Sequence, residues 1–179
     1  MAPVAPRSGG STPRAAFALL ADVVPVGSLH TSLGGAALDV DTSTAYGVSA
    51  GAELFVSRVL AVGVVPRFIW GLHGPGAMNS ATQLDMLVRA SAGTPAGDGL
   101  SVQVYGNVGM SWIFAPDDTR SSGLTFGFGA AASYAIGDAN FVRLDISYQL
   151  GRQGASVGGV DVDASSSLLH VGLGLGTYL

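Results

Sequence analysis

The sequence predicts an all-β protein built as one closed, eight-stranded, antiparallel, up-and-down transmembrane β-barrel. Three observations lead to this fold class. Apolar and polar residues alternate with a period of two in eight segments, as they do along a strand whose successive side chains face opposite sides. The apolar row of every segment is free of charge through the strand body. The connections between segments are alternately long and short, as when a closed sheet has short turns at one end and longer loops at the other.

Composition supports the same class. The chain has 179 residues, of which 48% are hydrophobic and only 11% charged, whereas about a quarter of the residues in a soluble domain carry a charge. A net charge of −4 argues against a nucleic-acid partner, which requires a clustered basic surface. The absence of cysteine removes disulfides and thiolate-bound metals. No apolar run reaches the length of a transmembrane helix.

The chain is predicted to consist of a flexible N-terminal arm, residues 1–13, and a barrel domain, residues 14–179. The arm is rich in proline, serine and glycine, a composition typical of a loose terminus. Its first residues contain no apolar stretch of the kind found in a secretory signal. If the protein is exported, we expect this sequence to represent a mature form.

The eight predicted strands cover, in order, about 15–26, 44–56, 58–72, 81–92, 100–114, 123–136, 140–151 and 166–179. Their apolar rows, which we assign to lipid, run from Phe17 to Val23, Tyr46 to Val56, Leu60 to Leu72, Leu84 to Ala90, Val102 to Phe114, Leu124 to Ile136, Val142 to Leu150 and Leu169 to Leu179. Each segment is long enough for a transmembrane strand, which needs about 9–11 residues.

A soluble sheet with one wet face also alternates, but here the polar row is small and glycine-rich instead of Lys-, Glu- and Thr-rich. A soluble ligand-binding barrel would need the apolar rows inside, and eight strands of bulky side chains would overfill it. Aromatic residues of the apolar rows are predicted to form interfacial girdles. These residues are Tyr46, Trp70, Trp112, Phe114, Phe126, Tyr134 and Tyr148.

The charged residues of the strands all fall on the polar row, which is predicted to face the lumen. They are Asp22, Glu53, Arg67, Asp85, Arg89, Arg143 and Asp145, and His170 shares their parity. Because an isolated buried charge is costly, we expect a plug of ion pairs and hydrogen bonds that also includes Gln103, Tyr105, Asn107 and Gln149. A turn near Pro75 would place Arg67 opposite or diagonal to Asp85 and Arg89.

The predicted long connections are 27–43, 73–80, 115–122 and 152–165, and the short ones are 57–58, 93–99 and 137–139. The second short connection is longer than an ideal periplasmic turn. The long loops are expected outside the cell and, because the strand count is even, both termini in the periplasm. The segments 32–35 and 156–159 echo each other around Gly-Gly. They predict either hairpins that continue the wall or two independent glycine-rich loops.

With this strand count, this alternation of loops and this C-terminal strand, the chain resembles the small OmpA/OmpX-type outer-membrane barrels over residues 15–179. The resemblance implies a location in the outer membrane of a Gram-negative cell, surrounded by outer-membrane lipid. It also implies that the last strand carries the signal for the barrel-assembly machinery: Leu173, Leu175, Tyr178 and Leu179. The family usually ends in Phe or Trp, so Leu179 departs from the pattern.

Three functional hypotheses follow. The first is a closed membrane anchor whose loops carry surface interactions. The second is a narrow passive channel, because lumen glycines such as Gly63, Gly109, Gly127, Gly129, Gly172, Gly174 and Gly176 leave space. The third is an outer-membrane hydrolase, because a Gly-Gly hairpin would put His170 across from Ser147 with Asp145 diagonal. No cofactor or metal is expected, although Asp39, Asp41, Asp161 and Asp163 could either bind Ca²⁺ or only solvate the loops.

Overall fold

The computed structural model describes residues 14–33, 36–73, 80–94, 99–115, 120–157 and 160–179. The strands within them are β1 (Ala15–Leu33), β2 (Ala36–Thr42), β3 (Ala45–Phe55), β4 (Leu60–Leu72), β5 (Ala81–Gly93), β6 (Leu100–Phe114), β7 (Arg120–Ala135), β8 (Asn140–Val157) and β9 (Val160–Tyr178). No helix in this described part is long and apolar enough to cross a membrane.

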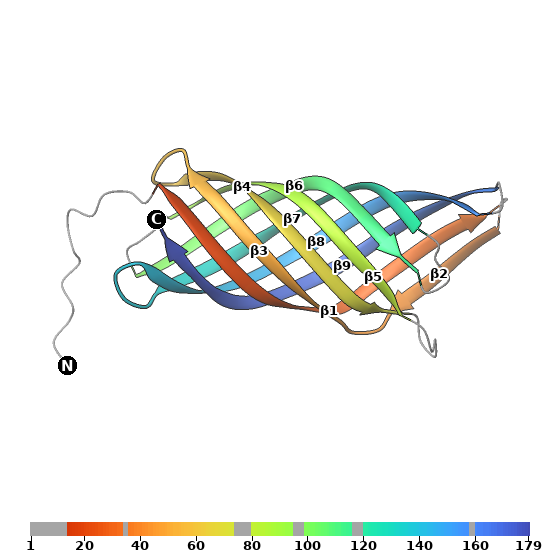
Figure 1. Cartoon of the computed structure of the whole chain (residues 1–179), viewed down its shortest axis with the longest axis horizontal. Coiled ribbons are helices and arrows are strands. Elements are labelled where there is room, and N and C mark those ends of the chain that lie inside the picture. The colour runs from red at the N-terminus through yellow and green to blue at the C-terminus, as the bar shows by residue number, and fades with distance from the viewer. Residues whose placement is uncertain (1–13, 34–35, 74–79, 95–98, 116–119, 158–159) are drawn as a thin grey trace.

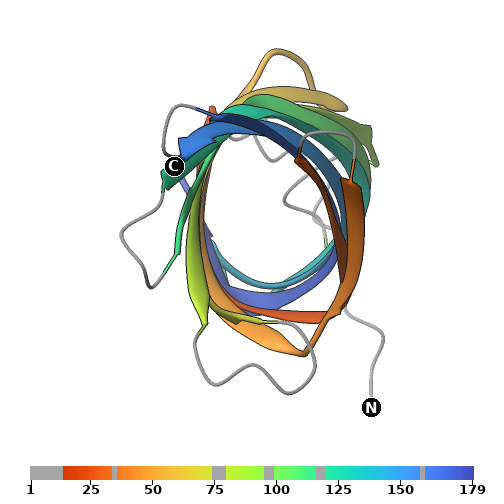
Figure 2. The same ribbon diagram turned by 90° about the vertical axis from the view of Figure 1, so that its right-hand side faces the viewer.

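The strands form one antiparallel sheet that closes on itself through pairing of β1 with β9. β3 pairs with the first part of β1, from Ala15 to Val24, and β2 pairs with the last part of β1, from Gly27 to Leu33. The two short strands therefore share one position in the wall, so the closed barrel is eight-stranded, as predicted. Figure 2 shows the closed ring viewed down the axis of the barrel.

The two ends of the barrel differ. β1 begins and β9 ends at the same end (Figure 1), where the amide of Arg14 donates to the carbonyl of Leu179 at 3.1 Å. β3, β5 and β7 also end there, and we call this the turn end. The opposite end, the loop end, carries two hairpins that rise above the other strands, β1–β2 and β8–β9.

These hairpins confirm one of the two interpretations of the repeated glycine-rich segments. Leu33 pairs with Ala36, and Val157 pairs with Val160, so each hairpin has a two-residue connection at the expected Gly-Gly, which itself lies outside the described residues. The predicted loops 27–43 and 152–165 are consequently strand over most of their length. The wall is extended by backbone pairing instead of by irregular loops.

The alternation of the sequence appears as an apolar outside and a polar inside. On β6, for example, Val104 is 60% exposed, whereas its neighbour Tyr105 is only 5% exposed. The exposed rows are those assigned to lipid, and they expose large apolar side chains on every strand of the closed ring. Because these residues would face water in a soluble protein, the wall fits a membrane.

One residue was assigned to the wrong face. Leu72 was predicted to point outward, but it is 9% exposed and packs with Val24, Ala45 and Ile69 in the lumen. A β-bulge between Trp70 and Leu72 shifts the register, and Gly71 adopts a φ of 79° there, a conformation that glycine tolerates best. The extra residue reverses the parity of the strand end.

A second bulge interrupts β1 between Val23 and Val26, where Pro25 cannot donate a ladder hydrogen bond. Val24 is buried before this bulge and Gly27 after it, so the parity changes here too. Both bulges lie where the regular wall meets the loop end.

Replacing Gly174 by alanine is expected to lower the free energy of unfolding in detergent by about 1–3 kcal/mol, the usual cost of overpacking. A Cβ at this position would collide with the backbone carbonyl of Leu19 on the neighbouring strand. Gly51→Ala is the matched control, because a Cβ there meets nothing within 4 Å. Urea titration monitored by tryptophan fluorescence measures both, and equal effects would contradict the wall geometry.

Candidate functional site

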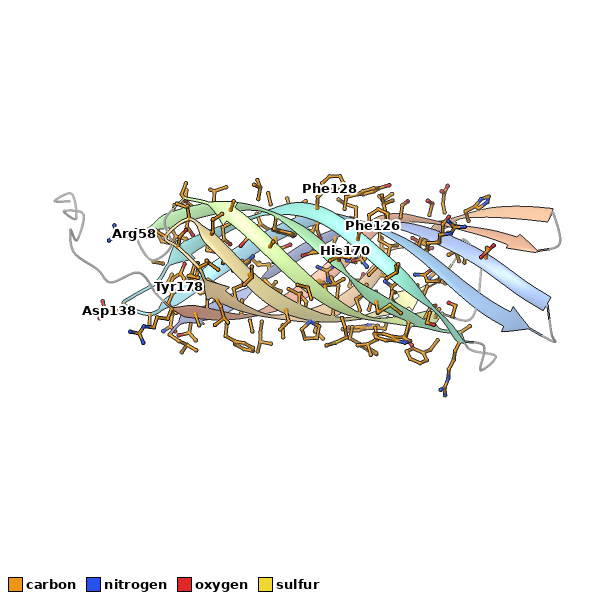
Figure 3. All side chains as sticks on the ribbon, turned by 90° about the horizontal axis from the view of Figure 1, so that it is seen from above. Arg58, Phe126, Phe128, Asp138, His170 and Tyr178 are labelled. Carbon is orange, nitrogen blue, oxygen red and sulfur yellow. The ribbon has the colours of Figure 1, made fainter. Side chains whose placement is uncertain are left out.

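The inward rows converge on a chain of buried polar side chains that runs through the lumen. All eight residues assigned to the lumen charge network are buried: Asp22 on β1, Glu53 on β3, Arg67 on β4, Asp85 and Arg89 on β5, Arg143 and Asp145 on β8, and His170 on β9. Figure 3 shows His170 enclosed by the barrel wall.

The half of this network nearer the turn end is built on two ion-paired carboxylates. Arg143 donates to both oxygens of Glu53, at 3.2 and 3.4 Å, the bidentate geometry in which arginine binds a carboxylate most strongly. Asp145 Oδ2 lies 3.1 Å from Arg89 and 3.5 Å from Arg143. The two pairs are therefore joined into one cluster across the lumen.

Polar and aromatic partners complete the coordination of Arg89. Its guanidinium lies 3.8 Å from the centre of the Tyr105 ring, and its Nε donates to Asn107 Oδ1 at 3.1 Å. The Tyr105 hydroxyl donates to Asp145. The cation thus contacts a carboxylate, an amide and an aromatic face, which together replace the water it has lost.

The half nearer the loop end is organised by Gln149. Its side-chain carbonyl accepts from Arg67 at 3.0 Å, and its amide donates to Asp85 at 2.9 Å and to Thr125 at 2.8 Å. Arg67 is directly opposite Asp85 in the register, as expected, yet the side chains are linked through Gln149. Arg67 Nε also lies 3.8 Å from Asp22.

The network contains four acids and only three arginines, yet each acid has a partner. Glu53, Asp145 and Asp22 each lie within ion-pair distance of an arginine. Asp85 instead accepts hydrogen bonds from the two side-chain amides of Gln83 and Gln149. Buried carboxylates need such partners, because an uncompensated one costs several kcal/mol.

Apolar clusters lie beside the charged network toward each end. Phe141, Ala16 and Ala18 pack with Phe55 and Tyr178 near the turn end. Toward the loop end, Val24, Ala45, Ile69, Leu72 and Leu168 form a second buried cluster. Neither cluster was predicted from the sequence, because the inward row was expected to be polar. Their only sequence signal was the inward parity of these apolar residues.

The lumen glycines do not leave an open sector. A Cβ at Gly129 would collide with Tyr105, one at Gly176 with Phe141, and one at Gly172 with Asp22. At these three positions the expected space is therefore occupied by side chains from other strands. Near Glu53 and Arg89 a lumen cavity of about 10 Å³ remains, room for roughly one water molecule.

The residues of the hydrolase hypothesis are neighbours, but they do not form a triad. Ser147 pairs with His170 in the register. However, neither the Ser147 hydroxyl nor either ring nitrogen of His170 has a hydrogen-bond partner, and Asp145 is bound to Arg89 and Tyr105. All three side chains are buried in the lumen.

The other predicted site residues lie on the outer surface or at the chain end. The girdle residues Tyr46 and Trp70 are paired neighbours near the loop end, whereas Figure 3 places Phe126 near the middle of the barrel's length. In the C-terminal strand, Leu173, Leu175 and Leu179 are exposed on the wall. Tyr178 points inward and packs 4.6 Å from the Phe141 ring centre.

The loop acids provide no assembled cation site in the described part of the chain, where no group of three or more possible metal ligands occurs. Asp41 and Asp163 are exposed. The side chains of Asp39 and Asp161 lie outside the description. The predicted N-terminal arm, residues 1–13, also lies outside the described residues.

Asp145→Ala is expected to lower the free energy of unfolding by about 3–5 kcal/mol, because it leaves Arg89 and Arg143 with one carboxylate fewer in a buried site. Asp41→Ala, an exposed acid on β2, is expected to change it by less than about 0.5 kcal/mol. Urea unfolding in lipid vesicles measures both. Similar values for the two variants would show that the lumen network does not stabilise the barrel.

Comparisons with known proteins agree on the architecture. No family model matches the sequence, and neither does any curated protein. Among solved structures, the chain is similar to the outer membrane protein OprG from Pseudomonas aeruginosa, with a TM-score of 0.59, 13% identity, and coverage of 96% of this chain and 98% of that one. It is also similar to Neisserial surface protein A, with a TM-score of 0.54, 15% identity, and coverage of 92% and 99%. Its fold is that of the small eight-stranded outer-membrane β-barrels.

Proposed function

We propose that the protein is a closed outer-membrane anchor, in which a plugged barrel holds the loop end at the cell surface for interactions with other molecules. The observation that carries this proposal is the filled lumen. Ion pairs and hydrogen bonds cross it from wall to wall, and an apolar cluster lies toward each end. An eight-stranded barrel is just wide enough for its own side chains to fill it.

The narrow channel is the less favoured function. It requires a continuous polar path, and three of the seven glycines that were expected to open one, Gly129, Gly176 and Gly172, are covered by Tyr105, Phe141 and Asp22. A hydrolase is less favoured still, because Ser147 and His170 are buried in the lumen and make no hydrogen bond to each other. We assign these two residues to the plug.

The interaction surface of the anchor is its loop end, comprising the segments 27–43, 73–80, 115–122 and 152–165. Two of these segments are largely ordered hairpins that extend the barrel wall. Paired strands offer a rigid, preorganised surface, which reduces the entropy lost on binding. Outer-membrane lipid surrounds the wall, and we propose that the exposed Leu173 and Leu175 of β9 are read by the barrel-assembly machinery.

In a planar lipid bilayer the purified wild-type barrel is expected to give no discrete conductance above the background of the bare membrane. Adding a general porin to the same bilayer afterwards provides the positive control. Reproducible single-channel steps from the wild type would contradict the plugged lumen and favour the channel.

The orientation can be tested because the chain contains no natural cysteine. Ser165→Cys lies on an exposed position of the β8–β9 hairpin, and Ala139→Cys lies on an exposed turn at the opposite end. On intact cells, a polymer-linked maleimide too large to cross the outer membrane is expected to label only the first variant. Labelling of Ala139→Cys alone would place the turn end outside and reverse the proposal.

A further inference from the structure

The arginines of the described chain divide into three groups according to position. Arg67, Arg89 and Arg143 are buried in the lumen, and Arg14 and Arg58 are exposed at the turn end. The remaining two, Arg120 and Arg152, are exposed near the loop end. These two have no ion-pair partner in the network described above, so their placement needs a separate explanation.

Arg120 and Arg152 lie on one outward patch of neighbouring strands. Arg120 is the first residue of β7, and Arg152 on β8 pairs with Leu124, four residues further along β7. From the spacing of residues and strands, their Cα atoms are roughly 14 Å apart. Because arginine side chains are long, both guanidinium groups can reach the space between them.

The floor of that space consists of small or polar positions. Ser122 lies on β7 between the two arginines and pairs with Gly154. Both residues are exposed, and a Cβ built on Gly154 would meet nothing within 4 Å. On the other side of Arg152 its register partner is Ser165, also exposed. The patch therefore presents hydroxyl groups and open room between two cations.

Below Arg120, toward the middle of the membrane, the same face is apolar and hollowed. A surface hollow is lined by Leu84, Met86, Trp112 and Phe114, with Arg120 and Ser122 at its polar side. The Arg120 guanidinium lies 5.7 Å from the centre of the Phe114 ring. A cation at the edge of an apolar hollow matches a lipid, which joins an anionic headgroup to hydrocarbon.

We propose that Arg120 and Arg152 bind the phosphorylated headgroup of an outer-leaflet lipid, with one of its acyl chains along the hollow between β5, β6 and β7. Guanidinium groups favour phosphate because they form paired, charge-assisted hydrogen bonds to its oxygens. The inference rests on the proposed orientation, in which the loop end meets the outer leaflet. Under this inference Arg120 and Arg152 bind lipid and not the molecules that the loop end is proposed to bind.

Among the side chains that the structure describes near the patch, one carboxylate opposes this binding. Asp163 on β9 pairs with Gly154, so it is diagonal to Arg152 and exposed. It reduces the positive potential of the patch without occupying the space beside Ser122. Removing its charge should therefore strengthen binding, an effect opposite in sign to removal of either arginine.

The binding experiment uses Trp112 as the reporter. Trp70→Phe leaves Trp112, a lining residue of the hollow, as the sole tryptophan. The folded barrel in uncharged maltoside micelles is titrated with diphosphoryl lipid A, and the change in Trp112 fluorescence gives the apparent affinity. In this background, R120Q/R152Q is expected to weaken binding about 30-fold, or roughly fivefold for each arginine near a charged lipid surface. D163N is expected to strengthen it.

The matched control is R14Q/R58Q, which removes the same charge from the turn end and is expected to bind as the parent does. Equal affinities for R120Q/R152Q and R14Q/R58Q would overturn the proposal. An identical fluorescence change with inorganic phosphate alone would overturn it in favour of a free-anion site. Each variant is first checked for heat-modifiable migration on SDS gels. A folded barrel without selective lipid binding refutes only this inference, whereas failure to form a detergent-stable barrel refutes the proposed anchor.

Discussion

The interior charge of the barrel is the constraint on which the rest of the structure depends. Four acids and three arginines project into a narrow lumen, and an unpartnered charge there would cost several kcal/mol. Their partners come from distant strands: Arg143 reaches Glu53 across 90 residues of sequence, and Arg89 reaches Asp145 across 56. A one-residue slip of any strand would turn its charges toward lipid. Register, apolar wall and ion pairs therefore support one another.

Close packing in the lumen follows from a complementarity between glycines and large side chains. Gly129 makes room for Tyr105, and Gly176 makes room for Phe141. At these two inward positions the glycine therefore accommodates a bulky side chain from another strand. This arrangement makes the interior rigid, because each large side chain is held by backbone on one side and by the polar network or an apolar cluster on the other. A rigid interior suits an anchor better than a conduit.

Arginine serves two purposes in this chain, and strand parity separates them. On β8, Arg143 faces inward and is buried by its partners, whereas Arg152 faces outward at the level where the apolar wall gives way to hydroxyl groups. The same contrast holds between Arg89 on β5 and Arg120 on β7. The inner arginines neutralise fixed carboxylates, whereas we propose that Arg120 and Arg152 bind lipid phosphate. The protein's net charge of −4 therefore says little about its local surface potential.

The sequence by itself determined the wall: the number of strands, the lipid-facing rows and the inward parity of every predicted lumen charge. Alternation is a local property, because successive residues of any strand face opposite sides. The tertiary structure alone decided which charges meet, as in the link from Arg67 to Asp85 through Gln149. It also decided that the Leu72 side chain points into the lumen after the bulge at Gly71. The same holds for the space beside Gly129 and Gly176, which Tyr105 and Phe141 fill. These features depend on bulges and on contacts across the ring, which the period of a single strand does not encode.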